Sequence, residues 1–400
     1  CDRMQKNNTK GHKISVPEKK YKKTPKIPPK GFESANDFFN YTFENKDLIW
    51  MGQNTNHLHD ENIINDAMIE CIESKEYCKY PAPEGFPELK RLILEDLDLD
   101  PEIMDVYVSA GATESLHLCM HNILQPEDNV ITCDPGYLII GSFAERFAKE
   151  VKYVPIYNKE CNYKLTPELI KENMDENTKI IVLIDPLNPL GTAYTEEEIK
   201  EIAKIAVEND IFLIHDVTYR DFARKHFLAA KYAPNNTLTI YSFSKIFGMA
   251  GLRIGAVVAP KPLIASIKNV VVNDLGVNII AQKGAIAGLK SKPEWIEKIR
   301  EITFNNQKLI KETVDKIDGI FLPVYPADAN MMVIDLTDTG IKAKDLANYL
   351  LDKDIFVREG NYTSKKYGDR YLRISFSIPT KEVEVFCKEL PKAIEALRTK

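Results

Sequence analysis

The chain has 400 residues, of which 44% are hydrophobic, and a formal net charge of -6. This length predicts one large domain of roughly 200–250 residues together with a smaller one. The mild acidic charge argues against nucleic acid as the main partner, and no apolar run approaches the ~18 residues of a membrane helix. Seven scattered cysteines without a Cys-x-x-Cys pattern predict neither a metal site nor a disulfide framework. We therefore expect a reducing, cytoplasmic location.

Residues 1–30 differ in composition from the rest of the chain. They carry ten basic and two acidic side chains, together with four prolines. Such a segment predicts a disordered N-terminal arm, and a tether or a contact with an anionic surface is its functional alternative. The start at Cys1 also leaves open a processed, lipid-anchored chain.

The large domain is expected at 61–284, and the small domain at 31–60 and 285–400. Between about residues 105 and 258, short apolar runs alternate with amphipathic segments, which predicts a mainly parallel seven-stranded sheet in a three-layer α/β/α domain. The expected strands are 106–109, 129–133, 152–156, 179–184, 211–215, 237–241 and 254–259. The expected helices are 61–73, 87–95, 112–123, 138–149, 167–173 and 196–207.

The remaining pattern predicts the smaller α+β domain. A long helical stretch is expected from 260 to about 316. Strands are expected at 330–336, 355–357 and 370–376, and helices at 343–351 and 380–397.

Polar residues follow the ends of several expected strands, where parallel sheets bind their ligands. Gly111, Ala112 and Thr113 form a small-residue turn that opens a helix. Backbone N–H groups and the helix dipole make such a turn a phosphate cradle, although a plain helix cap explains it equally well. Tyr137 could stack on a planar ring, or be a core tyrosine. Asn188 lies in a turn rich in Pro and Gly and offers an amide donor to a ring oxygen.

Asp216 ends the fifth strand, where a buried carboxylate is costly unless a cation pairs with it. A protonated pyridine nitrogen would supply that cation and would make the ring an electron sink. Tyr219 could donate to a ring hydroxyl. For Asp216 alone, a helix cap is the alternative.

Lys245 lies among small, apolar and hydroxyl side chains, three residues after Ser242 and eight before Arg253. Desolvation lowers the pKa of an ammonium and frees the amine to attack a carbonyl. A serine and an arginine can together hold a phosphate dianion. The combination suits a Schiff-base lysine beside a phosphate-bearing aldehyde, which is pyridoxal phosphate. A surface lysine is the alternative, because so short a motif matches by chance.

Taken in this order, these residues resemble the class I/II aminotransferases, the fold-type I pyridoxal-phosphate enzymes, over roughly residues 45–395. The resemblance implies that Lys245 carries the cofactor and moves the proton at the substrate Cα, and that Asp216 is the pyridinium partner. It implies that Asn188 and Tyr219 contact the ring hydroxyl and that Tyr137 stacks on the ring. The implied phosphate cup comprises Gly111, Ala112, Thr113, Ser242 and Arg253.

The same resemblance implies the substrate contacts and a partner. Arg373 matches the arginine that binds the substrate α-carboxylate, for which a planar guanidinium is apt. Asn54 and Asn188 are the further substrate-binding residues. Tyr80 matches a tyrosine that reaches the phosphate of a neighbouring subunit, which implies a homodimer with shared sites. The peptides Asp134-Pro135 and Asn188-Pro189 are expected to be cis.

Two turns depart from the family pattern. The usual Asn-Pro-x-Asn-Pro-Thr-Gly reads Asp185-Pro186-Leu187-Asn188-Pro189-Leu190-Gly191, and the usual Gly-x-Pro reads Gly52-Gln53-Asn54-Thr55-Asn56. The second segment is expected to line the substrate pocket. Its amides, with the spacing of Val357-Arg358-Glu359-Gly360, are most similar to the histidinol-phosphate and aspartate branches.

The resemblance implies transfer of an amino group between an L-amino acid and a 2-oxo acid. A pyridoxal-phosphate decarboxylase or lyase of the threonine-phosphate decarboxylase type stays an alternative, because the same fold supports more than one bond cleavage. A non-catalytic sensor fused to a DNA-binding module would need roughly 60–70 residues of helix-turn-helix, and the basic arm is shorter than that.

Overall fold

The computed structural model describes residues 31–59 and 62–398. The basic arm predicted at 1–30 lies outside the described residues. Contacts within the chain separate a unit that ends at Lys46 from a unit that begins at Asp47. The first unit contains the helix α1 (Ala35–Glu44), which begins where the side chain of Ser34 accepts a hydrogen bond from the Asp37 N–H.

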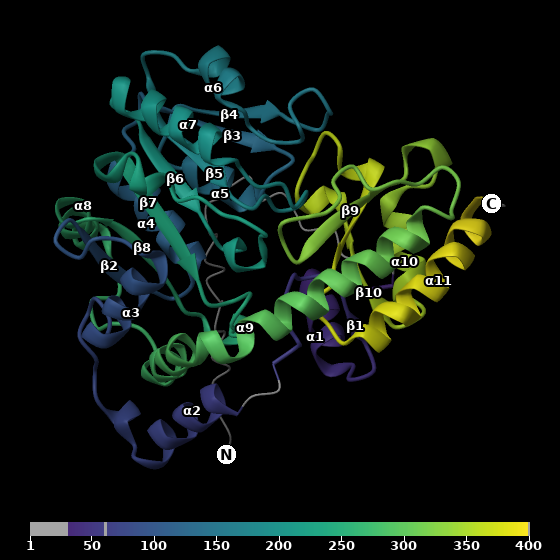
Figure 1. The fold of residues 1–400 in the computed structure, drawn as a ribbon, viewed down its shortest axis with the longest axis horizontal. Coiled ribbons are helices and arrows are strands. Elements are labelled where there is room, and N and C mark those ends of the chain that lie inside the picture. The colour runs from purple at the N-terminus through teal and green to yellow at the C-terminus, as the bar shows by residue number, and fades with distance from the viewer. Residues whose placement is uncertain (1–30, 60–61, 399–400) are drawn as a thin grey trace, which may run out of the picture. The chain divides into compact units, whose positions relative to one another are not determined.

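A seven-stranded sheet forms the centre of the second unit (Figure 1). Its strands lie in the order β2-β8-β7-β6-β5-β3-β4, and only β8 runs antiparallel to its neighbours. The bounds are β2 (Met104–Ser109), β3 (Asn129–Asp134), β4 (Glu150–Pro155), β5 (Thr178–Ile184), β6 (Phe212–Asp216), β7 (Thr237–Ser242) and β8 (Gly255–Pro260). The predicted, mainly parallel sheet of seven strands is confirmed.

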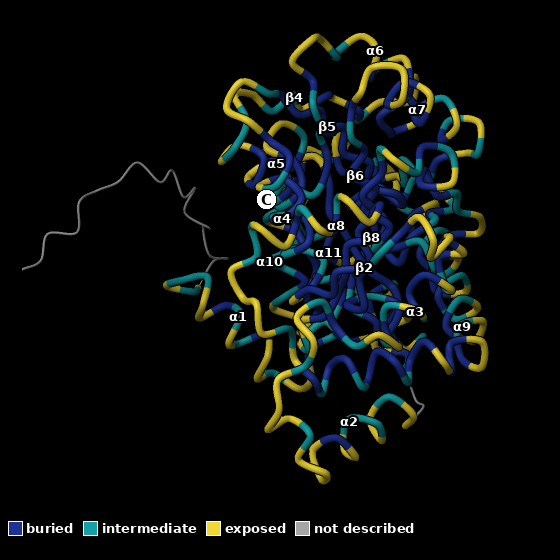
Figure 2. Tube along the Cα trace, turned by 90° about the vertical axis from the view of Figure 1, so that its left-hand side faces the viewer, coloured by how far each residue is buried: buried dark blue, intermediate teal, exposed yellow. Residues whose placement is uncertain are grey.

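Helices cover both faces of this sheet, because successive side chains of a strand point to opposite faces. On β8, Val257 packs in one apolar core with side chains of α4, α5, α6, α7 and α8, whereas its neighbour Val258 packs in a second core with α3 and α9. Figure 2 shows the central strands β5, β6 and β8 as mostly buried and the outer turns of the helices as exposed. The predicted three-layer arrangement is therefore confirmed.

The helices agree with the predicted ranges except around residues 260–316. Their bounds are α2 (Ile63–Glu73), α3 (Pro87–Leu97), α4 (Ala112–Ile123), α5 (Leu138–Ala144), α6 (Pro167–Asn173), α7 (Glu196–Glu208), α8 (Lys261–Ile267) and α9 (Ile279–Val314). The single helical stretch expected after residue 260 is wrong. Gly276 adopts a left-handed φ of 80°, and Asn278 then caps a new helix by accepting from the Ala281 N–H. The helix expected at 138–149 also ends early, at Ala144.

Two smaller sheets and a third apolar core follow. The strands β11 (Arg358–Glu359), β12 (Tyr371–Ser375) and β9 (Met331–Asp335) form an antiparallel sheet in that order, and β1 (Ile49–Trp50) pairs in parallel with β10 (Ile355–Phe356). The helices α10 (Ala343–Leu351) and α11 (Thr380–Arg398) supply most of their apolar cover. The predicted domain boundaries at residues 60 and 285 stay a prediction.

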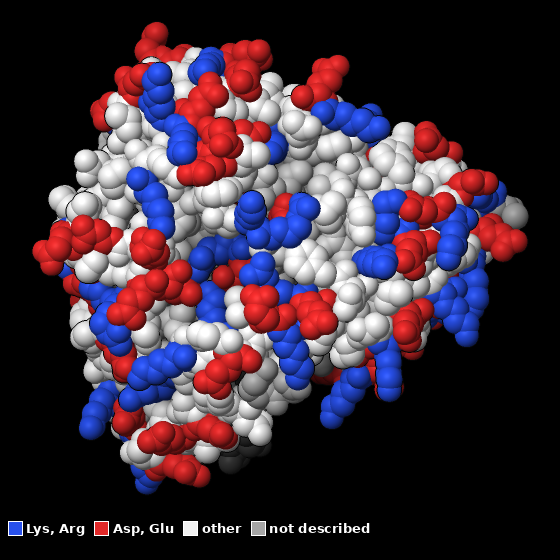
Figure 3. Space-filling model, in the orientation of Figure 1, with Lys and Arg blue, Asp and Glu red and all other residues white. Residues whose placement is uncertain are grey.

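The surface shown in Figure 3 carries acidic and basic side chains interspersed. Several form ion pairs within one helix, such as Arg91 with Glu95 on α3. Exposed pairs of this kind contribute little stability each. Between residues 31 and 398, apart from 60 and 61, no helix is both long and apolar enough to span a membrane.

Candidate active site

A cavity of about 320 Å³ lies at the carboxyl ends of β5, β6 and β7. Eleven of the thirteen residues predicted for the site line it, namely Asn54, Ala112, Thr113, Tyr137, Asn188, Asp216, Tyr219, Ser242, Lys245, Arg253 and Arg373. Gly111 lies directly behind the lining, at the N-cap of α4. Tyr80 is not part of this cavity, and its side chain is exposed.

Lys245 follows β7 by three residues and carries the amine of the cavity. Its Nζ donates to the Gln53 carbonyl oxygen at 2.9 Å and lies 6.0 Å from the centroid of the Tyr219 ring. Burial lowers the pKa of this ammonium to about 7. The positive charges of Arg373 and Arg253 also lower this pKa, whereas the negative charge of Asp216 raises it. A large fraction of the amine is therefore neutral and nucleophilic near neutral pH.

Asp216 supplies a buried carboxylate at the end of β6. The backbone N–H of Thr218 (3.0 Å) and its hydroxyl (2.5 Å) both donate to Oδ1. Burial raises the pKa of this carboxyl, although the Thr218 contacts oppose the change. Within the described residues the hydrogen bonds to this side chain end on Oδ1, which leaves Oδ2 to meet a cation in the cavity.

Gly111 opens the helix α4 in a conformation that a side chain would disturb. Its φ is 93°, and a Cβ there would lie 2.4 Å from Nη2 of Arg253. This close approach brings the guanidinium to the first N–H groups of α4, where the helix dipole is positive. With the hydroxyls of Thr113 and Ser242 on the cavity wall, the group can hold a phosphate dianion.

Arg373, on β12, reaches the cavity from the smaller sheet. Its Nη1 donates to Oδ1 of Asn188 at 3.0 Å and its Nη2 to the Gly52 carbonyl oxygen at 2.7 Å. Burial lowers the pKa of the guanidinium to about 10. Its Nε is buried and has no hydrogen-bond partner among the described residues.

Asn54 joins the first segment of the site to Tyr219. It adopts a left-handed φ of 54°, and its Nδ2 donates to the Tyr219 hydroxyl at 3.2 Å. Its Oδ1 is buried without a partner in the described part of the chain. Tyr137 also lines the cavity, and burial raises its pKa although the hydrogen bond with Thr113 lowers it.

Sequence reasoning did not assign a second arginine that the structure places in the cavity. β11 pairs with β12 so that Arg358 lies directly opposite Arg373, and both guanidiniums line the cavity. Like charges at opposed positions repel. The Gly52 carbonyl oxygen accepts from both side chains, with the Arg358 contact at 3.3 Å, and the Tyr362 ring lies 3.7 Å below the Arg358 guanidinium.

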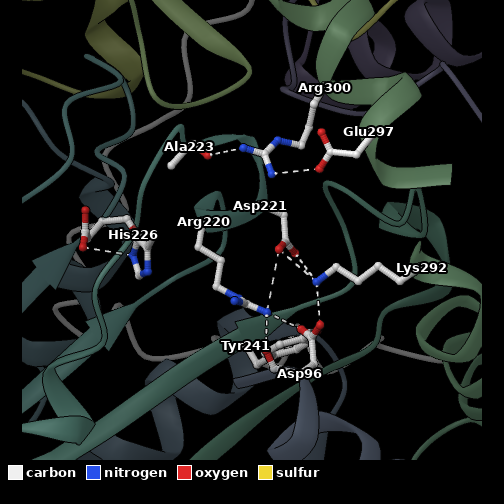
Figure 4. A network of polar contacts seen from close by, with 10 residues as sticks. Asp96, Arg220, Asp221, Ala223, His226, Tyr241, Lys292, Glu297 and Arg300 are labelled. Atoms are coloured by element: carbon white, nitrogen blue, oxygen red, sulfur yellow. Dashed lines mark hydrogen bonds and ion pairs between the residues drawn. The ribbon is translucent and has the colours of Figure 1, made fainter. Parts of the chain in front are cut away.

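A partly buried ion-pair network joins α3, α9 and the segment after Tyr219 (Figure 4). Lys292 on α9 donates to Asp96 at 2.7 Å and to both oxygens of Asp221 at 2.9 Å. Arg220 also pairs with Asp96, which accepts from the Tyr241 hydroxyl at 2.6 Å. Two carboxylates thus balance two cations in a partly buried setting.

The network supports two segments that carry side chains of the cavity. Arg220 directly follows Tyr219 and belongs to the short 3-10 helix Arg220–Phe222. Tyr241 directly precedes Ser242 at the end of β7. Contacts with Asp96 on α3 and Lys292 on α9 therefore hold both segments.

Comparisons with known proteins agree with this geometry. A family model described as aminotransferase class I and II matches residues 46–390. The chain is 27% identical over 369 residues to the aspartate aminotransferase of Pyrococcus horikoshii, an alignment that covers 90% of this chain and 94% of that protein. It is 28% identical over 363 residues to the histidinol-phosphate aminotransferase of Methanocaldococcus jannaschii, with 88% and 91% covered.

The fold is also similar to solved structures. A single mutant of Thermus thermophilus aspartate aminotransferase superposes with a TM-score of 0.78 at 24% identity, over 89% of this chain and 94% of that one. At that identity the likeness concerns the fold. It agrees with the mainly parallel sheet and its helical layers.

Proposed function

Because the chain belongs to the aminotransferase class I and II family, we propose that it transfers an amino group between an L-amino acid and a 2-oxo acid, with pyridoxal phosphate bound at Lys245. The family match confirms the predicted aminotransferase and does not favour the decarboxylase or lyase alternative. The observation that carries the assignment of the site is the partly buried amine of Lys245, with a pKa of about 7, in one cavity with Asp216 and Arg373.

The chemistry of the cavity residues fits this cofactor. The N-terminus of α4, Ser242 and Arg253 suit its phosphate. The buried carboxylate of Asp216 needs a cation, which a protonated ring nitrogen supplies. When bound, pyridoxal phosphate withdraws electrons from the substrate Cα and so makes its proton acidic.

The residues that line the cavity bind the substrate, move its proton and orient the ring. Arg373, whose guanidinium lines the cavity, binds the substrate α-carboxylate. The Lys245 amine, neutral in part near pH 7, takes the proton from the substrate Cα. Tyr219, held by Asn54, and Asn188, held by Arg373, are the polar groups that orient the ring.

The pair of arginines favours a substrate with a second anionic group. Arg358 and Arg373 lie opposite each other on neighbouring strands. The Gly52 carbonyl oxygen accepts a hydrogen bond from both guanidiniums. Because both guanidiniums line the cavity, an α-carboxylate could pair with Arg373 and a side-chain carboxylate with Arg358. Aspartate, for which one of the two similar enzymes is named, has a side-chain carboxylate beside its α-carboxylate.

We extend the proposal to a homodimer and to the cytoplasm. Tyr80 is 78% exposed and lies outside the cavity of its own chain. Ile69 and Ile72 on α2 and Tyr77 are also about half exposed, which is unusual for large apolar side chains so close in sequence. A second copy of the chain would cover them and give Tyr80 a phosphate to reach. The free thiols of the described cysteines support a reducing location.

A single-turnover spectral screen tests the proposed reaction. The purified protein, loaded with pyridoxal phosphate, is mixed with a panel of L-amino acids, and the cofactor absorbance and released products are followed. We expect one equivalent of 2-oxo acid per site, with L-aspartate ahead of neutral amino acids. Arg358→Met should remove that preference and leave neutral amino acids unaffected. Release of CO2 instead of a 2-oxo acid would overturn transamination.

A further inference from the structure

A buried carboxylate and two imidazoles lie beside the strand ends that carry Asp216 and Asn188. The Nε2 atoms of His215 and of His226 each lie 3.0 Å from Oδ2 of Asp185. Asp185 and His215 are fully buried, and the His226 side chain is 8% exposed. Figure 4 shows His226 pointing away from the ion-pair network, with its contact dashed. This trio, the carboxylate–imidazole cluster, is separate from the residues that line the cavity.

The hydrogen bonds identify the protonation of the cluster. The Ala229 N–H donates to Nδ1 of His215 at 3.2 Å, so that ring carries its proton on Nε2 and donates it to Asp185. A protonated Nε2 cannot coordinate a metal ion, although the ligand atoms of the three residues lie within 4.8 Å of one another. Burial would raise the pKa of Asp185, but His226 and His215 together lower it. The cluster is thus an ionised carboxylate held by imidazole donors.

Main-chain contacts connect this cluster to the site. His215 directly precedes Asp216 on β6, and the Asp185 N–H donates to the Asp216 carbonyl oxygen at 2.9 Å. Asp185 also begins the turn that carries Asn188. His226 Nε2 lies 3.1 Å from the Asp185 carbonyl oxygen as well, and so fastens that turn at its first residue.

We propose that Asp185, His215 and His226 are positioning residues, which hold Asp216 and Asn188 where the ring of the cofactor meets them. The inference rests on the proposed function for the identity of the ligand and on these contacts for its geometry. Movement at Asp185 would reach Asp216 through one hydrogen bond and Asn188 through three residues of turn. The role of the cluster is therefore to set the geometry of the ring-facing groups, without contact with substrate or cofactor.

The two histidines also explain why an aspartate suits the first position of this turn. The Asp185 Oδ2 receives both imidazole donors, and its Oδ1 receives the Tyr194 N–H at 3.2 Å. An asparagine at this position would turn its NH2 group, which is itself a donor, toward the two imidazole N–H groups in one orientation. In the other orientation the NH2 group would face the Tyr194 N–H. His215 cannot change tautomer to relieve the conflict, because Ala229 donates to its Nδ1. An aspartate is therefore the residue that satisfies all the donors.

The experiment compares Asp185→Asn with Asp335→Asn in the holoenzyme. Asp335 is a second buried carboxylate, which accepts from Tyr157 and does not line the cavity. We expect Asp185→Asn to weaken pyridoxal phosphate binding about 10–100-fold, the effect of stranding buried donors. It should also speed hydrogen–deuterium exchange over 185–191 and 212–219. Asp335→Asn should lower the melting temperature and leave cofactor affinity and exchange in those segments unchanged.

A conservative pair keeps the test decisive if Asp185→Asn fails to fold. His226→Gln places an amide N–H where Nε2 donates, whereas His226→Phe keeps the ring and removes the donor. We expect the Gln variant to retain wild-type affinity and exchange and the Phe variant to lose both. Equal behaviour of the two variants, or a stoichiometric metal ion in the purified protein, would overturn the proposal. A wild type that binds no pyridoxal phosphate would refute the proposed function, while the exchange measurement would still test the cluster.

Discussion

The depressed pKa of Lys245 predicts how the stability of the cofactor-free protein depends on pH. An exposed lysine titrates near 10.5, whereas the folded chain lowers this pKa to about 7. A shift of that size corresponds to up to about 5 kcal/mol. Below about pH 7 the amine is protonated in both the folded and the unfolded chain. The free energy of unfolding is then reduced by the full cost of burying the charged ammonium. As the pH rises, the folded chain releases its proton first, and the free energy of unfolding increases until about pH 10.5.

The assay is denaturant unfolding of the cofactor-free protein at several pH values. Between about pH 7 and about pH 9, Lys245 should add about 2 kcal/mol to the free energy of unfolding. Lys245→Met removes the titrating group, so the difference between wild type and variant should change by that amount over the interval. Lys200→Met is the matched control, because Lys200 lies on the exposed side of α7 and pairs only with Glu196 among the described residues. Its difference from wild type should stay constant.

Parallel curves for wild type and Lys245→Met would refute the reasoning. They would mean that the amine keeps its ordinary pKa in the folded chain. The burial of Lys245 and its proximity to two guanidiniums would then not activate it, and another base would be needed at the substrate Cα.

Three further substitutions test other parts of the account. Asp216→Ala should leave some pyridoxal phosphate bound but lower kcat by orders of magnitude, because the ring loses the charge that stabilises its protonated form; steady-state kinetics measures this, and near-normal turnover would contradict it. Gly52→Ala places a Cβ 2.5 Å from the Phe356 ring and should raise KM through the displaced carbonyl; an unchanged KM would count against that contact. Lys292→Met removes the nearer cation of Asp221, which keeps Arg220 at 3.7 Å, and should cost about 1–3 kcal/mol in denaturant unfolding; a neutral effect would show that the Lys292 contacts add nothing.

Much of the site followed from the positions of strand ends. Asp216 and Ser242 end neighbouring parallel strands, so their side chains had to meet at one edge of the sheet. The turn that we propose for the phosphate was also predictable, because Gly111 precedes a clear amphipathic helix. These are local patterns. A parallel sheet brings the carboxyl ends of its strands to one edge, so the local patterns alone predict that these side chains lie close together.

The contribution of Arg358 could not be predicted in the same way. It lies on the two-residue strand β11, which has no periodicity to reveal its face or its partner. Its place opposite Arg373 depends on the register of a short antiparallel pair. The sequence Val357-Arg358-Glu359-Gly360 indicated a branch of the family, but it did not predict where the Arg358 side chain lies.

The break in the predicted helix after residue 260 has a different cause. The apolar spacing of α8 and α9 continues on both sides of the interruption, so periodicity alone joined them. Gly276 and Asn278 were the available signals, a glycine that adopts positive φ and an N-cap side chain. Because a glycine and an N-cap residue mark helix boundaries, these two residues predict two separate helices when they are weighted above the apolar spacing.

The central claim is that one amine of this chain holds pyridoxal phosphate covalently. Treatment of the holoprotein with borohydride fixes the cofactor to the amine that carries it, and peptide mass spectrometry then locates the modified residue. The account predicts one pyridoxyl group per chain, on Lys245. A modification on another lysine, or an unmodified protein that nevertheless transaminates, would contradict it.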